Sequence, residues 1–242
     1  MFDKRRRYSY AVQKTRRYRI LWIVLCLAVL YILYNSLTSF FFPFRVLENN
    51  AMQPSLYAGD CVIFSSFSVH SLLSNFGPGK KPLPFRRGTV VLIDMSGRNG
   101  GGVFLSLFDG IVRFFTAQRA DLFGKEDRLY VKRVIGLPGD EITMTNFVIR
   151  VKPKDGSYNL TEFELSDKPY DITIPQVPAL WDESLPFSGN TDRIILGEDE
   201  CFVLSDDRSN TNDSRTWGPV RVDHITGKAL FRYWPLNSLG PP

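Results

Sequence analysis

The sequence predicts a mainly β protein, built from antiparallel sheets, behind one N-terminal membrane-spanning helix. Residues 20–44 contain no charged side chain, and about 20 apolar residues span a bilayer core. Beyond this run, short segments rich in Val, Ile and Phe are separated by Gly, Pro, Asn and Asp, which is typical of short strands. Two such segments flank Thr145-Asn146, which indicates a β-hairpin. The length of 242 residues allows one large domain or two small ones.

Residues 1–19 are strongly basic, with eight Lys and Arg against the single acid Asp3. A basic cluster can indicate nucleic acid or a membrane surface, and the charge-free run that follows favours the membrane. Because cationic flanks stay in the cytoplasm, we expect residues 1–19 to be cytoplasmic, residues 20–42 to form the anchor and residues 43–242 to lie outside. A cleaved signal peptide is the alternative, but the run is long for one and no clear Ala-x-Ala site follows it. A buried core helix would not explain the basic flank.

The strand-like segments beyond the anchor are short and closely spaced, which favours an antiparallel sandwich or barrel. They are Asp60–Phe64, Gly88–Ile93, Tyr130–Ile135, Glu141–Met144, Phe147–Val151, Glu200–Leu204 and Ala229–Trp234. Residues 103–118 interrupt this pattern with apolar side chains at helical spacing. We expect a helix packed on the β-core, with an in-plane membrane contact as the alternative. The polar, Pro-rich region 150–198 is expected to be an insertion or a second β subdomain.

Residue counts disfavour two common kinds of site. The only histidines, His70 and His224, lie in no protease-like setting, so a Ser-His-Asp triad is not expected. Cys61 and Cys201 would lie outside the membrane, where they either pair as a disulfide or act as small buried hydrophobes. No Cys-x-x-Cys or Cys/His spacing suggests a metal, and we expect neither a metal ion nor another cofactor.

Lys132 is a candidate general base. A free lysine has a pKa of about 10.4 and is protonated at neutral pH, but burial in apolar surroundings lowers that pKa by up to about 3–5 units. In the segment 130–135, strand alternation places Lys132 and Val134 on one face and Arg133 on the other. If the face of Lys132 points inward, its amine is desolvated; if not, Lys132 is an ordinary surface lysine. The pattern alone leaves both interpretations open.

Three blocks of sequence closely resemble those of the type I signal peptidases, membrane-anchored proteases that use a serine and a lysine. The blocks are Asn49-Asn50-Ala51-Met52-Gln53-Pro54-Ser55-Leu56, residues 130–140 (YVKRVIGLPGD) and residues 205–218 (SDDRSNTNDSRTWG). The first block in that family reads Ser-x-Ser-Met-x-Pro-Thr-Leu, and the serine before the Met is the nucleophile. The resemblance implies a mainly β fold with two antiparallel sheet domains.

The resemblance also implies roles for individual residues. Ala51 occupies the nucleophile position, and its methyl group cannot attack a carbonyl. Lys132 is the general base, and Asn49 together with the backbone N–H of Ala51 forms the oxyanion hole. Met52 and Pro54 belong to the substrate-binding segment. Ser55 is the nearest other hydroxyl, but we do not expect it to replace the missing nucleophile.

The third block departs from the family pattern Gly-Asp-Asn-Arg-x-Asn-Ser-x-Asp-Ser-Arg-x-Trp-Gly. Ser205 stands in place of the first Gly and Asp207 in place of the Asn. Thr211 replaces the serine that orients the lysine amine, and because it keeps the hydroxyl we expect Thr211 to do the same. Asp207 would raise the pKa of Lys132 if its carboxylate came close. The supporting ion pairs implied by the resemblance involve Asp206, Arg208, Asp213 and Arg215.

Two accounts of Ala51 remain open, an engineered Ser→Ala change and a natural pseudoenzyme. The resemblance implies that the partners are preprotein signal peptides and the lipid bilayer, with no nucleic acid and no metal. It places the chain in the bacterial cytoplasmic (inner) membrane, single-pass, with the main domain extracytoplasmic or periplasmic. As written, the chain is expected to be inactive as a serine endopeptidase. The alternative function is a catalytically dead, membrane-anchored module that binds preproteins or another partner.

Overall fold

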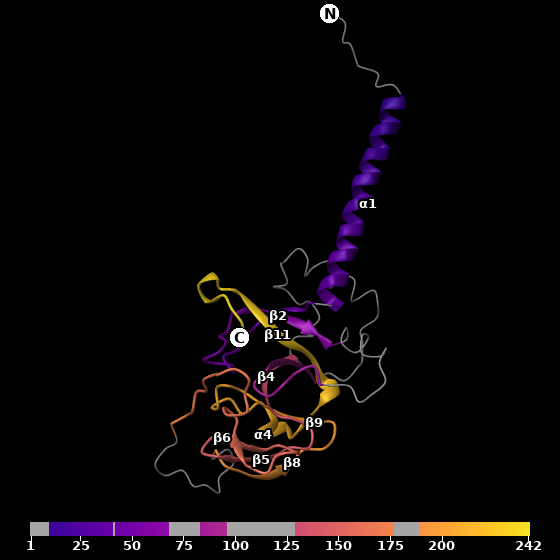
Figure 1. The fold of residues 1–242 in the computed structure, drawn as a ribbon. Coiled ribbons are helices and arrows are strands. Elements are labelled where there is room, and N and C mark those ends of the chain that lie inside the picture. The colour runs from indigo at the N-terminus through magenta and orange to yellow at the C-terminus, as the bar shows by residue number, and fades with distance from the viewer. Residues whose placement is uncertain (1–9, 41, 68–82, 96–128, 177–188) are drawn as a thin grey trace, which may run out of the picture.

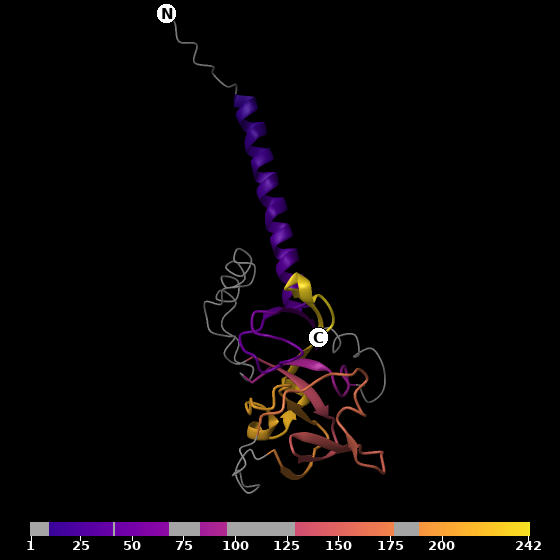
Figure 2. The same cartoon turned by 90° about the vertical axis from the view of Figure 1, so that its left-hand side faces the viewer.

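The computed structural model describes residues 10–40, 42–67, 83–95, 129–176 and 189–242, in which a long helix leads into a β-sheet body (Figure 1). The helix, α1 (Tyr10–Phe40), begins within the basic segment. Its stretch Thr15–Tyr34 is long and apolar enough to cross a membrane, and none of that stretch is buried within the protein. Because α1 stands away from the body in both ribbon views (Figure 1, Figure 2), it is not a core helix. The helix expected at residues 103–118 lies outside the described residues.

The larger sheet has seven strands in the order β1-β2-β11-β3-β4-β9-β10, and neighbouring strands run antiparallel. These strands are β1 (Phe44–Val46), β2 (Cys61–Ser66), β3 (Val90–Asp94), β4 (Leu129–Gly136), β9 (Glu200–Leu204), β10 (Val220–Arg221) and β11 (Ile225–Trp234). The C-terminal strand β11 lies between β2 and β3, so the end of the chain returns to the strands that follow the helix. A short helix, α4 (Ser214–Trp217), and two 3-10 turns, η2 (Val222–His224) and η3 (Leu236–Ser238), complete this part.

The smaller sheet has four antiparallel strands in the order β7-β6-β5-β8. They are β5 (Glu141–Thr145), β6 (Val148–Lys152), β7 (Leu160–Thr161) and β8 (Thr191–Ile195). Two antiparallel sheets were expected from the family resemblance, and this prediction is confirmed. The second sheet includes β5, so it begins before residue 150.

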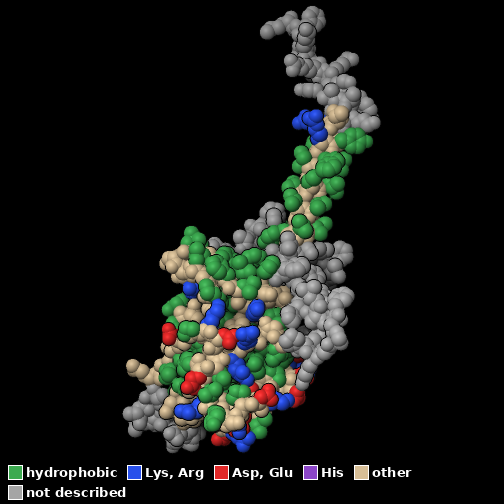
Figure 3. Space-filling view, viewed as in Figure 1, with side chains coloured by type: hydrophobic (Ala, Val, Ile, Leu, Met, Phe, Trp, Pro, Cys, Tyr) green, Lys and Arg blue, Asp and Glu red, His purple; other side chains and the backbone are tan. Residues whose placement is uncertain are grey.

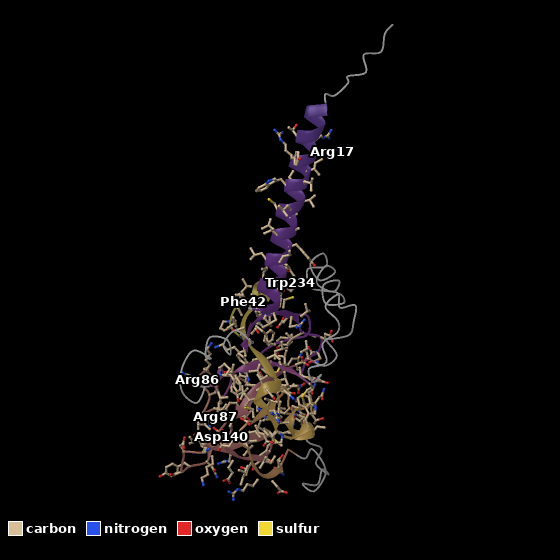
Figure 4. All side chains as sticks on the ribbon, turned by 90° about the vertical axis from the view of Figure 1, so that its right-hand side faces the viewer. Arg17, Phe42, Arg86, Arg87, Asp140 and Trp234 are labelled. Atoms are coloured by element: carbon tan, nitrogen blue, oxygen red, sulfur yellow. The ribbon has the colours of Figure 1, made fainter. Side chains whose placement is uncertain are left out.

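A tight turn joins β4 to the smaller sheet. Gly139 has a φ of +83°, which favours glycine, and the Asp140 carboxylate accepts a hydrogen bond of 2.8 Å from the N–H of Leu137. The same carboxylate is paired with Arg87, which Figure 4 shows beside it. The turn therefore fixes the end of β4 relative to the segment before β3.

The strands β3 and β4 are buried on both faces. Val91 and Val134 pack in one apolar cluster, whereas Val90 and Val131 pack in another. Strand alternation puts Lys132 on the face of Val134, so its aliphatic stem enters the protein interior rather than water.

The structure corrects the expected position of the β5–β6 turn and decides between the two interpretations of Cys61 and Cys201. The β5–β6 hairpin turns at Asn146-Phe147, one residue later than expected, because Thr145 pairs with Val148 in the ladder and both loop residues have positive φ. Cys61 and Cys201 are both free and buried, so the interpretation as small hydrophobes is confirmed over the disulfide. Burial raises the pKa of the Cys201 thiol to about 12.

Candidate active site

Lys132 lies in the middle of β4 and is 2 % exposed, so the inward-facing interpretation is confirmed. Its Nζ donates a hydrogen bond of 2.8 Å to the hydroxyl of Ser205, a residue that is fully buried. The amine also lies 5.8 Å from the ring centre of Trp217. The amine is therefore held by one hydroxyl and lies beside an aromatic ring.

The surroundings of Lys132 lower its pKa to about 8. Desolvation is the largest cause, because a buried ammonium loses its hydration. The negative charges of Asp213 and Asp206 act in the opposite direction, and the positive charge of Arg215 adds to the lowering. An appreciable fraction of the amine is thus neutral slightly above neutral pH, as a general base requires.

Ala51 lies on the segment between β1 and β2 and is 2 % exposed. Its carbonyl accepts a hydrogen bond of 3.1 Å from the N–H of Asp207. Because Ser205 is two residues before Asp207, the same short segment contacts both Ala51 and Lys132. Residues 205–207 thus link Ala51 to Lys132.

The two expected oxyanion groups contact each other. The backbone N–H of Ala51 donates a hydrogen bond of 3.1 Å to the side-chain oxygen of Asn49. The side-chain oxygen of Asn49 is therefore the acceptor in this contact, whereas its NH2 group was expected to donate to a substrate. A substrate carbonyl has to displace this contact before it reaches the amide of Ala51.

A pocket lies beside this segment. Its lining residues come from β1, β3, β4 and the stretch that leads to position 51: Arg45, Val46, Leu47, Glu48, Asn49, Met52, Leu92, Leu129 and Val131. Met52, expected in substrate binding, lines the pocket and is almost completely buried. Pro54 is exposed and is not among the lining residues.

Three buried ion pairs involve charged residues of the third block, but two of them differ from the pairing that the block suggests. Asp206 is paired through two hydrogen bonds with Arg133, the neighbour of Lys132. Arg208 is paired with Glu162, and neither side chain is exposed. Asp213 is paired with Arg215, in line with the ion pairs that the resemblance implied. Asp206 and Arg208 are therefore not partners of each other.

The Asp213 carboxylate has a second task. It accepts a hydrogen bond of 3.0 Å from the backbone N–H of Ser205. Burial alone would raise the pKa of Asp213, but its bonds to Arg215 and Ser205 hold the pKa below the usual value. The ionised carboxylate thus anchors the residue that contacts Lys132.

Three other side chains do not take the positions that motif reasoning considered for them. Within the described residues, the hydroxyl of Thr211 makes no hydrogen bond, and the amine of Lys132 is bonded to Ser205 instead. The hydroxyl of Ser55 accepts a hydrogen bond from Arg133, and the amine of Lys132 is bonded to Ser205 instead. The Asp207 carboxylate accepts hydrogen bonds from Ser209 rather than approaching the amine.

Sequence reasoning missed the contributions of Ser205, Arg133 and Glu162. Ser205 was noted only as a departure from the family pattern, although the pairing of β4 with β9 places it opposite Lys132. Arg133 adjoins the base but carries no separate motif. No sequence signal marks Glu162, because its partner lies 46 positions away in the chain. Among the described residues, no group of three Cys, His, Asp or Glu side chains is arranged to hold a metal ion.

The two antiparallel sheets and the apolar N-terminal helix have the architecture of a signal peptidase. The family model described as "Signal peptidase, peptidase S26" matches residues 19–234. The chain therefore belongs to the type I signal peptidase family, and its apolar helix together with this membership indicates a membrane-anchored protein.

Two relatives illustrate the similarity. Signal peptidase I of Bacillus caldolyticus is 32 % identical over 204 residues, which cover 84 % of this chain and 85 % of the relative. Signal peptidase IB of Staphylococcus aureus is 31 % identical over 151 residues, which cover 62 % of this chain and 71 % of the relative.

Proposed function

We propose that this chain binds the signal-peptide region of exported preproteins at a membrane, and that it does not cleave them because position 51 carries no hydroxyl. The observation that supports this most is the combination of a buried Lys132 with an alanine where the family has its nucleophile. On this proposal Lys132 is the base, and the hydroxyl that it would deprotonate is absent from position 51. In a comparable catalytic unit, loss of the nucleophile lowers the rate by about 10⁶.

The proposal assigns each group a role in a chain that has serine at position 51. The neutral amine of Lys132 accepts the proton of the serine hydroxyl while the oxygen attacks the scissile carbonyl carbon. The backbone N–H at position 51 stabilises the oxyanion after the contact with Asn49 opens. The Lys132 ammonium then returns its proton to the departing amine, and water hydrolyses the acyl-enzyme by the same route.

The proposed location is the bacterial cytoplasmic membrane, with residues 1–19 on the cytoplasmic side and the β-sheet body outside. The basic N-terminal segment beside α1 supports this orientation. Figure 4 shows Arg17 toward the N-terminal end of α1, and Phe42 and Trp234 at its other end. Protease added outside spheroplasts should digest the body, whereas protection of the body would contradict the orientation.

A binding module with a decayed site is the second candidate. The contact between Asn49 and the N–H of Ala51 supports it, because this contact occupies the oxyanion donor. On this account the chain binds preproteins but does not cleave them, even when position 51 carries a serine.

The test is the Ala51→Ser variant in detergent or bilayer, with a preprotein that has small residues at the P1 and P3 positions. We expect the parent to be inert at pH 8–9 and the variant to cleave. The matched control, Ala51→Ser with Lys132→Met, should be inert, because methionine keeps the apolar stem but cannot accept a proton.

Three results would contradict the proposal or part of it. Cleavage by the parent that Lys132→Met abolishes would refute the proposed lack of activity. An inert Ala51→Ser variant that still binds the preprotein would favour the decayed binding module. An inert variant that does not bind the preprotein would remove both candidates.

A further inference from the structure

The pairing of β4 with β9 places Ser205 directly opposite Lys132. In this antiparallel ladder Arg133 is the partner of Leu204 and Val134 is the partner of Val203. One step further along the same register brings Lys132 opposite Ser205, just beyond the end of β9. Directly opposite side chains lie on the same face, with Cβ atoms about 4.5–5.5 Å apart. A hydroxyl at position 205 is therefore within reach of the lysine amine, whereas the glycine of the family pattern offers none.

The backbone of Ser205 is held on both sides. Its own N–H donates to the buried carboxylate of Asp213. Its neighbour Asp206 is bonded to Arg133 through the side chain and to the N–H of Thr173 through the carbonyl. Because Ser205 is fully buried and its backbone is fixed, its hydroxyl meets the amine in a defined place.

The hydroxyl of Thr211 is not placed in the same way. Thr211 is on the loop between β9 and α4, and its carbonyl accepts the hydroxyl of Thr216 and the N–H of Asp213. Within the described residues its own hydroxyl makes no hydrogen bond. Among the described residues, the hydroxyl that the family pattern assigns to the lysine therefore makes no hydrogen bond with its amine.

We propose that Ser205, rather than Thr211, is the residue that positions the amine of Lys132 in this chain. The catalytic role of this contact rests on the proposed function, whereas the positioning of the amine by Ser205 does not depend on it. Ser205 touches the base and not the substrate, so it is a positioning residue. The hydroxyl accepts one N–H of the amine and so limits the directions in which the nitrogen lone pair can point.

The first test uses the chain with Ala51 unchanged and reads the side-chain pKa of Lys132 by NMR. We compare Ser205→Ala, Ser205→Gly and Thr211→Val with the parent. The Ser205 hydroxyl accepts a hydrogen bond from the ammonium, and its loss destabilises the charged form. Both Ser205 variants should therefore lower the pKa, and Thr211→Val should leave it unchanged. The charges that face the amine, those of Asp213, Asp206 and Arg215, are the same in all four proteins.

The second test adds Ala51→Ser and reads preprotein cleavage. We expect Ser205→Ala to lower kcat by about 10- to 100-fold with little change in KM, since a hydrogen bond to a charged group is lost while the pocket is untouched. Thr211→Val should keep kcat within about 3-fold of the Ala51→Ser parent, because valine has nearly the same shape.

The outcomes separate the two proposals. A pKa that changes in Thr211→Val and not in the Ser205 variants would overturn the assignment of Ser205. So would a loss of kcat confined to Thr211→Val. If Ala51→Ser is inert while the pKa of Lys132 still responds to position 205, the proposed function fails and the positioning role remains.

Discussion

Arg208 and Glu162 are charge partners, and neither has any exposed side-chain surface. Glu162 also accepts hydrogen bonds from the N–H of Ile149 and the hydroxyl of Tyr170. Two nitrogens of Arg208, Nε and Nη1, have no hydrogen-bond partner among the described residues. A buried pair of this kind adds little net stability, but removal of one partner leaves a buried charge uncompensated.

We therefore expect Glu162→Gln to lower the free energy of unfolding by about 3–5 kcal/mol. The matched control is Glu164→Gln, which changes the same functional group two residues away at an exposed position. Urea unfolding followed by circular dichroism gives both midpoints. Equal midpoints for the two variants would show that the Glu162–Arg208 pair does not hold the smaller sheet to the third block.

Lys132 should leave a pH signature in stability. Its pKa is about 8 in the folded chain and 10.5 in the reference state, so between these values the unfolded chain binds more protons. Stability then rises with pH across this window and the contribution is flat below it. Relative to Lys132→Met, the parent should gain about 3 kcal/mol from pH 8 to pH 10.5.

The control for this measurement is Lys154→Met, which changes a surface lysine paired with Glu198. The pKa of Lys154 is raised by its hydrogen bond to Glu198, so ionisation of Lys154 adds no stability between pH 8 and pH 10.5. The parent should therefore gain no stability relative to Lys154→Met across this range. If the free energy of unfolding of the parent changes between pH 8 and pH 10.5 in the same way as that of Lys132→Met, the amine is not desolvated.

At the scale of elements, the strands around the base could be predicted, but their pairing could not. The runs that became β4 and β9 are clear in the sequence, since both are apolar and bounded by turn residues. The family resemblance identified Lys132, and alternation placed it correctly relative to Val134. The contact with Ser205 depends on the register between two strands that are far apart in sequence, which no local pattern specifies.

The β5–β6 hairpin shows a smaller failure of the same kind. Asn146 and Phe147 have φ values of 51° and 65°, and Asn is common in this left-handed region whereas Phe is not. The N–H of Phe147 is bonded to the carbonyl of Gly189, and its ring covers the space where a side chain at position 189 would lie. Tertiary contacts thus place Phe147 in the turn.

We expect Asn146→Val to destabilise the protein by about 1–2 kcal/mol, because a β-branched residue is strained at positive φ. The matched variant Asn146→Gly keeps the conformation accessible and should be close to neutral. The hydrogen bond from the N–H of residue 146 to Asn190 is retained in both. Urea midpoints test this, and equal losses in the two variants would exclude backbone strain as the cause.

On the scale of the whole molecule, one group of exposed apolar side chains lies where the body meets the helix. Figure 3 shows hydrophobic side chains gathered on the top of the body, next to α1. Phe42 follows α1, and Phe231 and Trp234 belong to β11, which pairs with β2. Leu236 and Leu239 follow β11 and are more than half exposed. This end of the body is therefore suited to rest on the bilayer that α1 enters.

In vesicles that contain brominated lipids, we expect Trp234 to be quenched. Replacing it by phenylalanine should reduce the quenched part of the tryptophan emission. The control Trp217→Phe removes a tryptophan that packs on Tyr130 near the base, and it should not reduce the quenched part. A Trp234→Phe variant whose quenching matches the parent would place this end of the body in water.

The central claim is that the chain retains the base of a signal peptidase without its nucleophile. The most direct test is an NMR titration of the Lys132 side chain in the full-length chain in detergent, with the signal assigned by its loss in Lys132→Met. The account predicts a pKa of about 8, caused mainly by desolvation. A pKa near the ordinary value of 10.5 would contradict it, because the amine would then be hydrated and almost fully protonated at pH 8–9.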